Sequence, residues 1–157
     1  MNVRSLINLP VLLENNVEQI GQVKKVVIGD DFSIAYLVID DFKTGPGIIL
    51  RNDFSLWQEA VLINNLDCIK SYAHGEESSI YEKKIGDKVF DIEGKELGIL
   101  SDFILNRDDK EVRGVELSSG ILKDILDGRS EIPLEQVRWA SPASAMLKAE
   151  GSDDTWS

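Results

Sequence analysis

Residues 20–31 and 97–108 share one pattern of apolar, glycine and acidic positions. When the first stretch is moved forward by 77 positions, two residues become identical and five more match apolar with apolar. One residue inserted in the following turn brings three further apolar pairs into line, and two upstream positions match as well. The two identities are Gly21–Gly98 and Asp31–Asp108. The three further apolar pairs are Ile34–Val112, Leu37–Val115 and Ile39–Leu117, and the upstream pairs are Leu12–Val89 and Leu13–Phe90. The pattern predicts that the chain contains one small fold twice.

Short runs of apolar and β-branched residues indicate strands in both halves. Alternation is clearest in "AYLVID" and "VRGVEL", while "GIILR", "EIPL", "SLWQEAVLI" and "VRWAS" supply further strands. The intervening "GDDFS", "NRDDK" and "DIEGKE" carry the Gly, Asn and Asp residues that tight hairpins favour. Many short strands separated by such turns predict an all-β chain of two small barrels, each of about five or six strands.

Composition changes along the chain set the expected boundaries. We expect a first barrel at 1–69, a polar linker at 70–83, a second barrel at 84–140 and a tail at 141–157. The linker contains Gly75 and two adjacent serines and has no apolar period. In the tail, Ser141, Pro142 and Gly151 fit the start and the end of a short helix, with disorder beyond.

The second half has an insert that the first half lacks. In "SSGILKDILDGRSEIP", residues 118–133, four apolar residues recur at helical spacing. They are Ile121, Leu122, Ile125 and Leu126. A serine can cap the start and Gly128 can end the segment, so the pattern predicts one or two helical turns across a barrel mouth.

Charge and hydropathy exclude several classes of protein. The formal net charge is −11 and the sequence pI is about 4.5, so we expect no direct binding to nucleic acid. The chain has neither a signal-peptide pattern nor the roughly 18 consecutive apolar residues of a membrane span, which predicts no membrane insertion. A single cysteine, Cys68, suits a reducing compartment. We therefore expect a soluble cytoplasmic protein.

No combination of residues predicts catalysis. The single histidine, His74, comes six residues after Cys68, and two such ligands do not make a zinc site, which needs about four. The Asp–Asp pairs fall mostly in predicted turns, and none has the spacing of a calcium loop. "KTGPG" is followed by a strand, whereas phosphate loops open a helix. We expect a chain that is not an enzyme, with no catalytic residue, cofactor or metal.

The order of these elements resembles the PRC-barrel domain family. The resemblance is carried by "KIGDKVFDIEGKELGILSDFILNRDDKEVRGVEL" and "GILKDILDGRSEIPLEQV", and it points to bacterial tandem, two-repeat members in particular. A distant likeness extends to the cytoplasmic domain of the photosynthetic reaction-centre H subunit and to the C-terminal domain of the ribosome-maturation factor RimM. The resemblance implies a non-catalytic assembly or adaptor module. The alternatives are a ribosome-maturation or RNA-processing factor acting through a ribosomal protein, and a peripheral subunit of an electron-transfer complex.

The candidate interaction residues come from two sources. The leading hypothesis is an adaptor that docks on another protein through residues 118–130 of the insert. This segment offers Ile121, Leu122 and Ile125, with Arg129 able to pair with a carboxylate of a partner or of its own chain. Trp57 and Trp139 come late in each half, where they either close a barrel end or bind a partner. The expected partner is a protein of unknown identity. A homodimer and packing of the two barrels against each other are both compatible with this pattern.

Overall fold

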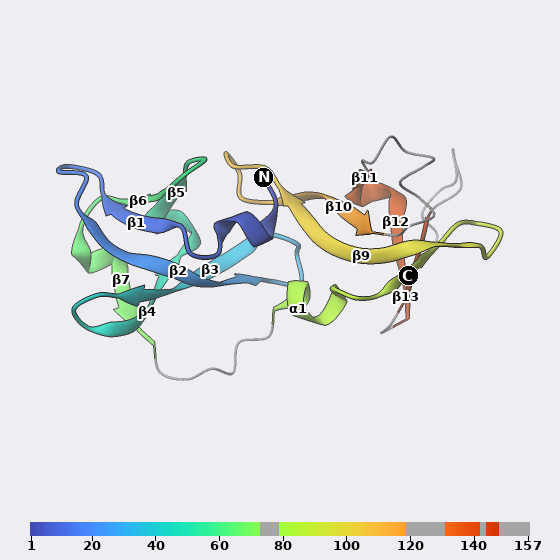
Figure 1. Cartoon of the computed structure of the whole chain (residues 1–157), viewed down its shortest axis with the longest axis horizontal. Helices are drawn as coiled ribbons and strands as arrows, with labels where there is room; N and C mark the ends of the chain where they lie inside the picture. Colours follow the sequence, from blue (N-terminus) through green and yellow to red (C-terminus); the bar gives the residue numbers. More distant parts are fainter. Residues whose placement is uncertain (73–78, 119–130, 142–143, 148–157) are drawn as a thin grey trace. The chain divides into compact units, whose positions relative to one another are not determined.

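The computed structural model describes residues 1–72, 79–118, 131–141 and 144–147 (Figure 1). The chain divides into two compact units. Unit 1 consists of Met1–Tyr81 together with Leu105–Val112, and unit 2 consists of Glu82–Ile104 together with Arg113–Ser157. Both units are built mainly from strands, which confirms the prediction of an all-β chain. Among the described residues, none of the helices reaches the length and apolarity that a membrane crossing requires.

Unit 1 holds a seven-stranded sheet in the order β5-β6-β1-β2-β3-β4-β7. Strand β1 pairs in parallel with β6, and the other neighbours are antiparallel. The elements are η1 (Val3–Leu6), β1 (Pro10–Leu13), β2 (Gln19–Ile28), β3 (Ile34–Asp41), β4 (Gly45–Leu50), η2 (Arg51–Asp53), β5 (Phe54–Leu56), β6 (Val61–Ile63), η3 (Leu66–Cys68) and β7 (Ile69–Ser71).

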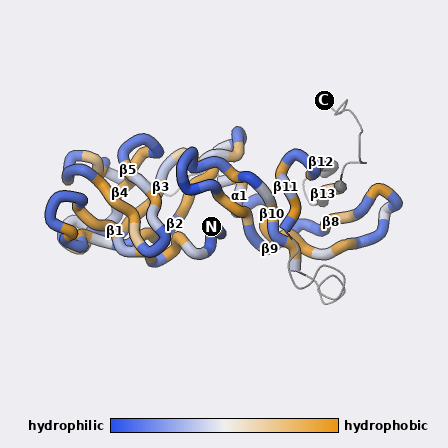
Figure 2. The backbone as a smooth tube through the Cα atoms, turned by 90° about the horizontal axis from the view of Figure 1, so that it is seen from above, coloured by the Kyte–Doolittle hydropathy of each residue, from blue (hydrophilic) through white to orange (hydrophobic). Residues whose placement is uncertain are grey.

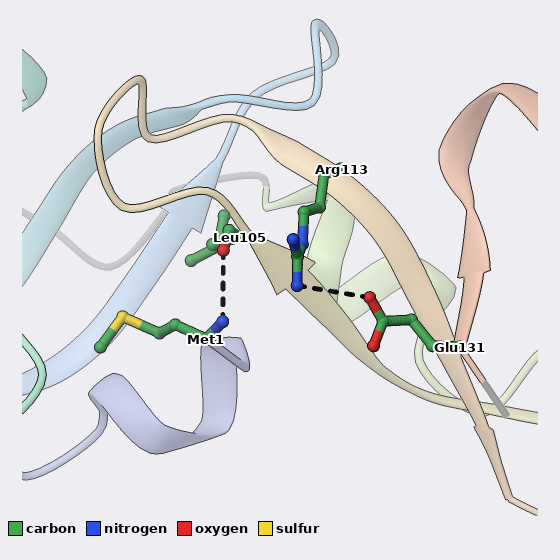
Figure 3. Close-up of polar contacts among 4 residues, drawn as sticks. All are labelled: Met1, Leu105, Arg113 and Glu131. Carbon is green, nitrogen blue, oxygen red and sulfur yellow. Dashed lines mark hydrogen bonds and ion pairs between the residues drawn. The ribbon is translucent and has the colours of Figure 1, made fainter. Parts of the chain in front are cut away.

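Unit 2 holds a six-stranded sheet in the order β11-β10-β9-β8-β13-β12. Strand β8 pairs in parallel with β13. An exposed ion pair joins β10 to β11, with 3.4 Å between an Arg113 guanidinium nitrogen and Glu131 Oε1 (Figure 3). The elements that follow β7 in the chain are α1 (Ile80–Lys84), β8 (Lys88–Phe90), β9 (Glu96–Leu105), β10 (Val112–Ser118), β11 (Glu131–Pro133), η5 (Leu134–Gln136), β12 (Val137–Ser141) and β13 (Ser144–Leu147).

The two sheets connect their strands in the same order. Strands β1 to β4 correspond to β8 to β11, and the parallel neighbour β6 with its antiparallel partner β5 corresponds to β13 with β12. Strand β7 has no counterpart among the described residues of unit 2. The same register shift also occurs in both sheets, after Val11↔Gly21 in one and after Val89↔Gly98 in the other.

The register corrects the upstream part of the sequence match. The structure places Val11, not Leu12, in the position of Val89, because each of these valines lies opposite the shared glycine. Gly21 comes ten positions after Val11, whereas Gly98 comes nine positions after Val89, so a constant offset of 77 does not hold upstream of the glycine. A slip of one residue exchanges the two faces of a strand, which makes the difference structurally relevant.

Each unit has an apolar core formed mainly by strand residues, which are buried alternately in some places and consecutively in others, as at Val26–Ile28 of β2. Figure 2 shows the same division along the chain, with hydrophobic residues recurring within strands and hydrophilic residues gathering at turns. The fully buried side chains of unit 1 include Val3, Leu6, Val11, Ile28, Ile34, Leu37, Ile39, Ile49 and Ile63, and those of unit 2 include Val89, Leu100, Phe103 and Val115.

The tip of the β9–β10 hairpin, Leu105–Val112, belongs to unit 1 although it lies far along the chain. Its backbone pairs with the start of β3, where Ile34 N–H donates to the Lys110 carbonyl at 2.9 Å. At the other side of the tip, Leu105 N–H donates to the Met1 carbonyl at 2.7 Å, and the Met1 amino group donates back to the Leu105 carbonyl at 3.3 Å (Figure 3). These bonds satisfy backbone groups of both partners.

The expected C-terminal helix is wrong where the structure describes the tail. Ser144–Leu147 is strand β13, hydrogen-bonded on one side to β12 and on the other to β8, with Ala145 fully buried. Pairing on both sides outweighs a helix propensity of a few tenths of a kcal/mol per residue. The expected helical insert, residues 118–133, lies outside the described residues apart from its ends, where Ser118 ends β10 and Glu131–Pro133 forms β11. Part of the expected linker forms β7 and α1.

Candidate functional site: exposed apolar surfaces of unit 1

The candidate interaction residues are divided between the two units and the part of the chain that is not described. Trp57 lies in unit 1, in the turn between β5 and β6, and Trp139 lies in unit 2, in β12. The candidates of the insert, Ile121, Leu122, Ile125 and Arg129, lie outside the described residues.

Trp57 is held on the surface by a tight hairpin. Its N–H donates to the Ala60 carbonyl at 2.9 Å, and its indole Nε1–H donates to Ser55 Oγ at 3.3 Å. The side chain is 57% exposed. Beside it, Leu12 and Leu62 face each other across the parallel β1–β6 pair and are half-buried. These three residues, which line an open pocket of about 460 Å³, are called the Trp57 surface below.

A second apolar hollow lies at the β3–β4 turn of unit 1. Its apolar lining is Leu13, Ile20, Phe42, Leu66 and Ile69, its polar rim is Glu18, Gln19, Asp41, Lys43 and Thr44, and its volume is about 290 Å³. The two most exposed apolar members are Phe42, at 58%, and Leu66, at 54%. We call this hollow the Phe42 groove.

Local hydrogen bonds fix the turn that presents Phe42. The Asp41 carboxylate accepts hydrogen bonds from the N–H groups of Lys43 at 2.9 Å and Thr44 at 3.3 Å, which is an Asx-type turn. The Phe42 N–H donates to the Ile20 carbonyl at 2.9 Å. The backbone is therefore anchored while the ring remains in contact with solvent. Sequence reasoning missed this residue, and its one signal is an aromatic residue within the polar turn "DDFKTG".

Trp139 is in a different setting from Trp57. It is half-buried, and the Lys84 ammonium lies 5.3 Å from its ring centroid, within the range of a cation–π contact. The structure thus gives Trp139 a role in joining β12 to Lys84, and both lie in unit 2. Trp57 is the more accessible of the two tryptophans that sequence analysis singled out.

A buried carboxylate lies close to Lys84. Asp87 is 7% exposed, and its Oδ2 has no hydrogen-bond partner. Burial raises the pKa of this carboxyl above its ordinary value, and the Lys84 ammonium opposes the shift. Both backbone groups of Asp87 are hydrogen-bonded: its N–H donates to the Lys84 carbonyl at 3.0 Å, and its carbonyl accepts from the Leu100 N–H at 2.8 Å. The described residues contain no group of three His, Cys, Asp or Glu side chains able to hold a metal ion.

Replacing Asp87 by asparagine should stabilise unit 2 at pH 7 by about 1 kcal/mol, since it is unfavourable to bury an ionised carboxylate whose Oδ2 has no hydrogen-bond partner. Because the folded-state pKa is raised, the ionised carboxylate destabilises the fold at pH values above that pKa. This penalty disappears as the pH falls through the folded-state pKa to below the ordinary 3.8. Urea unfolding at pH 7 and pH 4 measures the free energy of unfolding of both proteins. The difference in this free energy between wild type and Asp87→Asn should be smaller at pH 4 than at pH 7.

The matched control is Asp30→Asn, which changes an exposed carboxyl. It should shift the unfolding midpoint little at either pH. An Asp87→Asn variant that was less stable than wild type at pH 7 would contradict the account of Asp87.

Comparison with known proteins supports one family for the second half of the chain. The model of the PRC-barrel domain family matches residues 77–145, which extend from before α1 into β13. A search of curated proteins found no match. The part of the chain that holds most of unit 2 is therefore similar to the PRC-barrel domain, in agreement with the resemblance carried by its sequence.

Proposed function

We propose that this chain is a non-catalytic interaction module that binds a protein partner through the Trp57 surface of unit 1. The PRC-barrel match supports a general interaction or assembly role. The observation that carries the proposal is the exposure of Trp57, 57%, beside Leu12 and Leu62. Tryptophan is enriched among the few residues that dominate binding energy at interfaces, and an exposed one next to half-buried leucines fits the centre of such a contact.

The geometry of the turn reduces the cost of binding. The hydrogen bonds from Trp57 to Ala60 and to Ser55 hold both the backbone and the indole in one orientation. A side chain that is already oriented loses less conformational entropy when a partner covers it. The indole combines a large apolar face with one N–H donor, which suits a contact that is dry at its centre and polar at its rim.

We further propose that unit 1 is also of the PRC-barrel type, which would make the chain a tandem, two-repeat member. The family match covers residues 77–145 alone. The shared strand order, the parallel β1–β6 and β8–β13 pairs and the shared register shift opposite Gly21 and Gly98 support a common origin of the two units.

The insert with Ile121, Leu122, Ile125 and Arg129, which the sequence favours as the docking element, stays a candidate beside the Trp57 surface. Roles in ribosome maturation or in an electron-transfer complex also stay hypotheses. Both would use the same kind of protein contact, and neither is favoured by a contact of the described residues.

Replacing Trp57 by alanine should leave the fold intact and weaken partner binding by at least about 30-fold, the loss typical of a central aromatic residue. The side chain is mostly exposed, so the effect on stability should stay within about 0.5 kcal/mol. Affinity capture from native lysate with the full chain, quantified by mass spectrometry, measures the effect on binding.

Leu50→Ala is the matched control, because Leu50 is also an exposed apolar residue of unit 1, at 44%, and lies outside the Trp57 surface. Partners lost from Trp57→Ala and kept by Leu50→Ala support the proposal. If both variants kept every captured protein, the Trp57 surface would not be the binding site.

A further inference from the structure

We propose that the Phe42 groove and the outer edge of β7 together bind an extended peptide segment that carries basic and apolar residues. The peptide adds to the sheet of unit 1 as a strand beside β7, and one of its apolar side chains enters the groove. This inference rests on the proposed interaction function, and it uses a surface different from that of Trp57.

Strand β7 ends the sheet of unit 1 and has one unused edge. It pairs with β4 on one side, in the register Gly47↔Ser71, Ile48↔Lys70 and Ile49↔Ile69, and no strand among the described residues pairs with its other side. Lys70 and Ser71 are exposed. The Ile69 N–H already donates to the Leu66 carbonyl. In an antiparallel strand every second residue directs its N–H and C=O away from its partner, so the remaining outward groups of Ile69–Ser71 can accept another strand.

The groove adjoins the β7 edge. Ile69 is the first residue of β7 and also lines the groove, so a peptide paired with β7 brings a side chain to the groove beside Ile69. The volume of about 290 Å³ falls at the low end for ligand pockets, which suits one or two side chains better than a large cofactor. Backbone pairing supplies affinity in this mode of recognition, and the pocket supplies specificity.

Charge determines which peptide fits. Two of the three charged side chains that line the groove are carboxylates, Glu18 and Asp41, and the third is the Lys43 ammonium. Within the described part of the chain, neither carboxylate forms an ion pair. The residues next to the lining in the sequence add Glu14, Asp40 and Asp67 on the acidic side and Lys70 on the basic side. The Lys70 ammonium donates to the Asp67 carbonyl at 3.0 Å. A segment of alternating basic and apolar residues matches this surface, whereas an acidic segment is repelled.

The test uses a synthetic peptide of alternating lysine and leucine residues and a matched peptide with glutamate in place of lysine. The full chain, labelled with nitrogen-15, is titrated with each peptide and followed by NMR. The lysine peptide should shift the signals of the Phe42 groove, slow amide exchange within Ile69–Ser71 and bind more weakly as salt is raised. The glutamate peptide should not bind.

Three variants locate the site. Phe42→Ala removes the exposed ring and should weaken binding of the lysine peptide about tenfold. Glu18→Lys reverses a rim charge and should weaken it several-fold. Trp57→Ala should leave peptide binding unchanged, which separates this site from the Trp57 surface. Equal binding of both peptides, unchanged binding to Phe42→Ala, or unchanged amide exchange within Ile69–Ser71 would overturn the proposal.

Discussion

Replacing Gly21 by alanine should destabilise unit 1 by about 3 kcal/mol or more, because the new methyl group has no room between two strands. A Cβ built at Gly21 would lie 2.2 Å from the Asp40 carbonyl oxygen and 3.1 Å from the Asp41 Cα. Both are backbone atoms of β3, so relief requires β2 and β3 to separate. Separation would strain the adjacent bond from Phe42 N–H to the Ile20 carbonyl, and with it the Phe42 groove.

Gly29→Ala is the control for this prediction. A Cβ at Gly29 has one close neighbour, the Asp31 carboxylate oxygen at 3.2 Å, which belongs to a side chain that can move. The control should cost less than about 1 kcal/mol. Urea unfolding followed by circular dichroism measures both variants. Equal midpoints for the two would show that β2 and β3 do not approach as closely as the structure has them.

Replacing Lys110 by methionine should destabilise unit 1 by about 2 kcal/mol, since two carbonyls lose a charged donor. The Lys110 ammonium donates to the Arg51 carbonyl at 2.6 Å and the Phe54 carbonyl at 2.5 Å, and it lies 4.4 Å from the Phe54 ring centroid. Burial lowers the pKa of Lys110, the Arg51 guanidinium lowers it further and the Asp53 carboxylate opposes both. Burial and the nearby Arg51 charge make the ammonium form of Lys110 less favourable, which partly offsets the stabilisation from its hydrogen bonds.

Methionine is chosen because it keeps the apolar stem of lysine and faces the same strain at the left-handed backbone of position 110, where φ is 60°. Lys24→Met, at an exposed position of β2, is the matched control and should change stability little. Hydrogen exchange at the Ile34 and Val112 amides should accelerate in Lys110→Met, because both amides bond to backbone at this junction. Unchanged exchange at these amides would mean that Lys110 does not hold the hairpin tip.

Local patterns were sufficient to predict the strands that pair with close neighbours in the chain. The runs "AYLVID" and "VRGVEL" lie in β3 and β10. The turn "GDDFS" connects β2 to β3, and "DIEGKE" connects β8 to β9, as expected. The shared glycine of the two patterns, Gly21 and Gly98, lies opposite a valine next to a register shift in both sheets. A periodicity of two and glycine-rich turns are local signals, which explains why these elements were predictable.

The elements that escaped prediction depend on partners far away in the chain. Strand β13 forms because β8 and β12 are both available to pair with Ser144–Leu147. The hairpin tip 105–112 bonds to Met1 and to the start of β3, which no local pattern indicates. Likewise, the exposure of Phe42 and Leu66 depends on how turns meet at one end of unit 1. Trp57 was predictable as a candidate, because its place late in the first half indicated the end of a barrel.

The most direct test of the interaction function is to place a photoreactive phenylalanine at position 57 and, separately, at position 50, and to irradiate living cells that make each full-length protein. Both positions are exposed in unit 1, and only position 57 belongs to the Trp57 surface. The account predicts a crosslinked protein partner of defined mass from position 57 and none from position 50. No crosslink from position 57, or the same products from both positions, would contradict it.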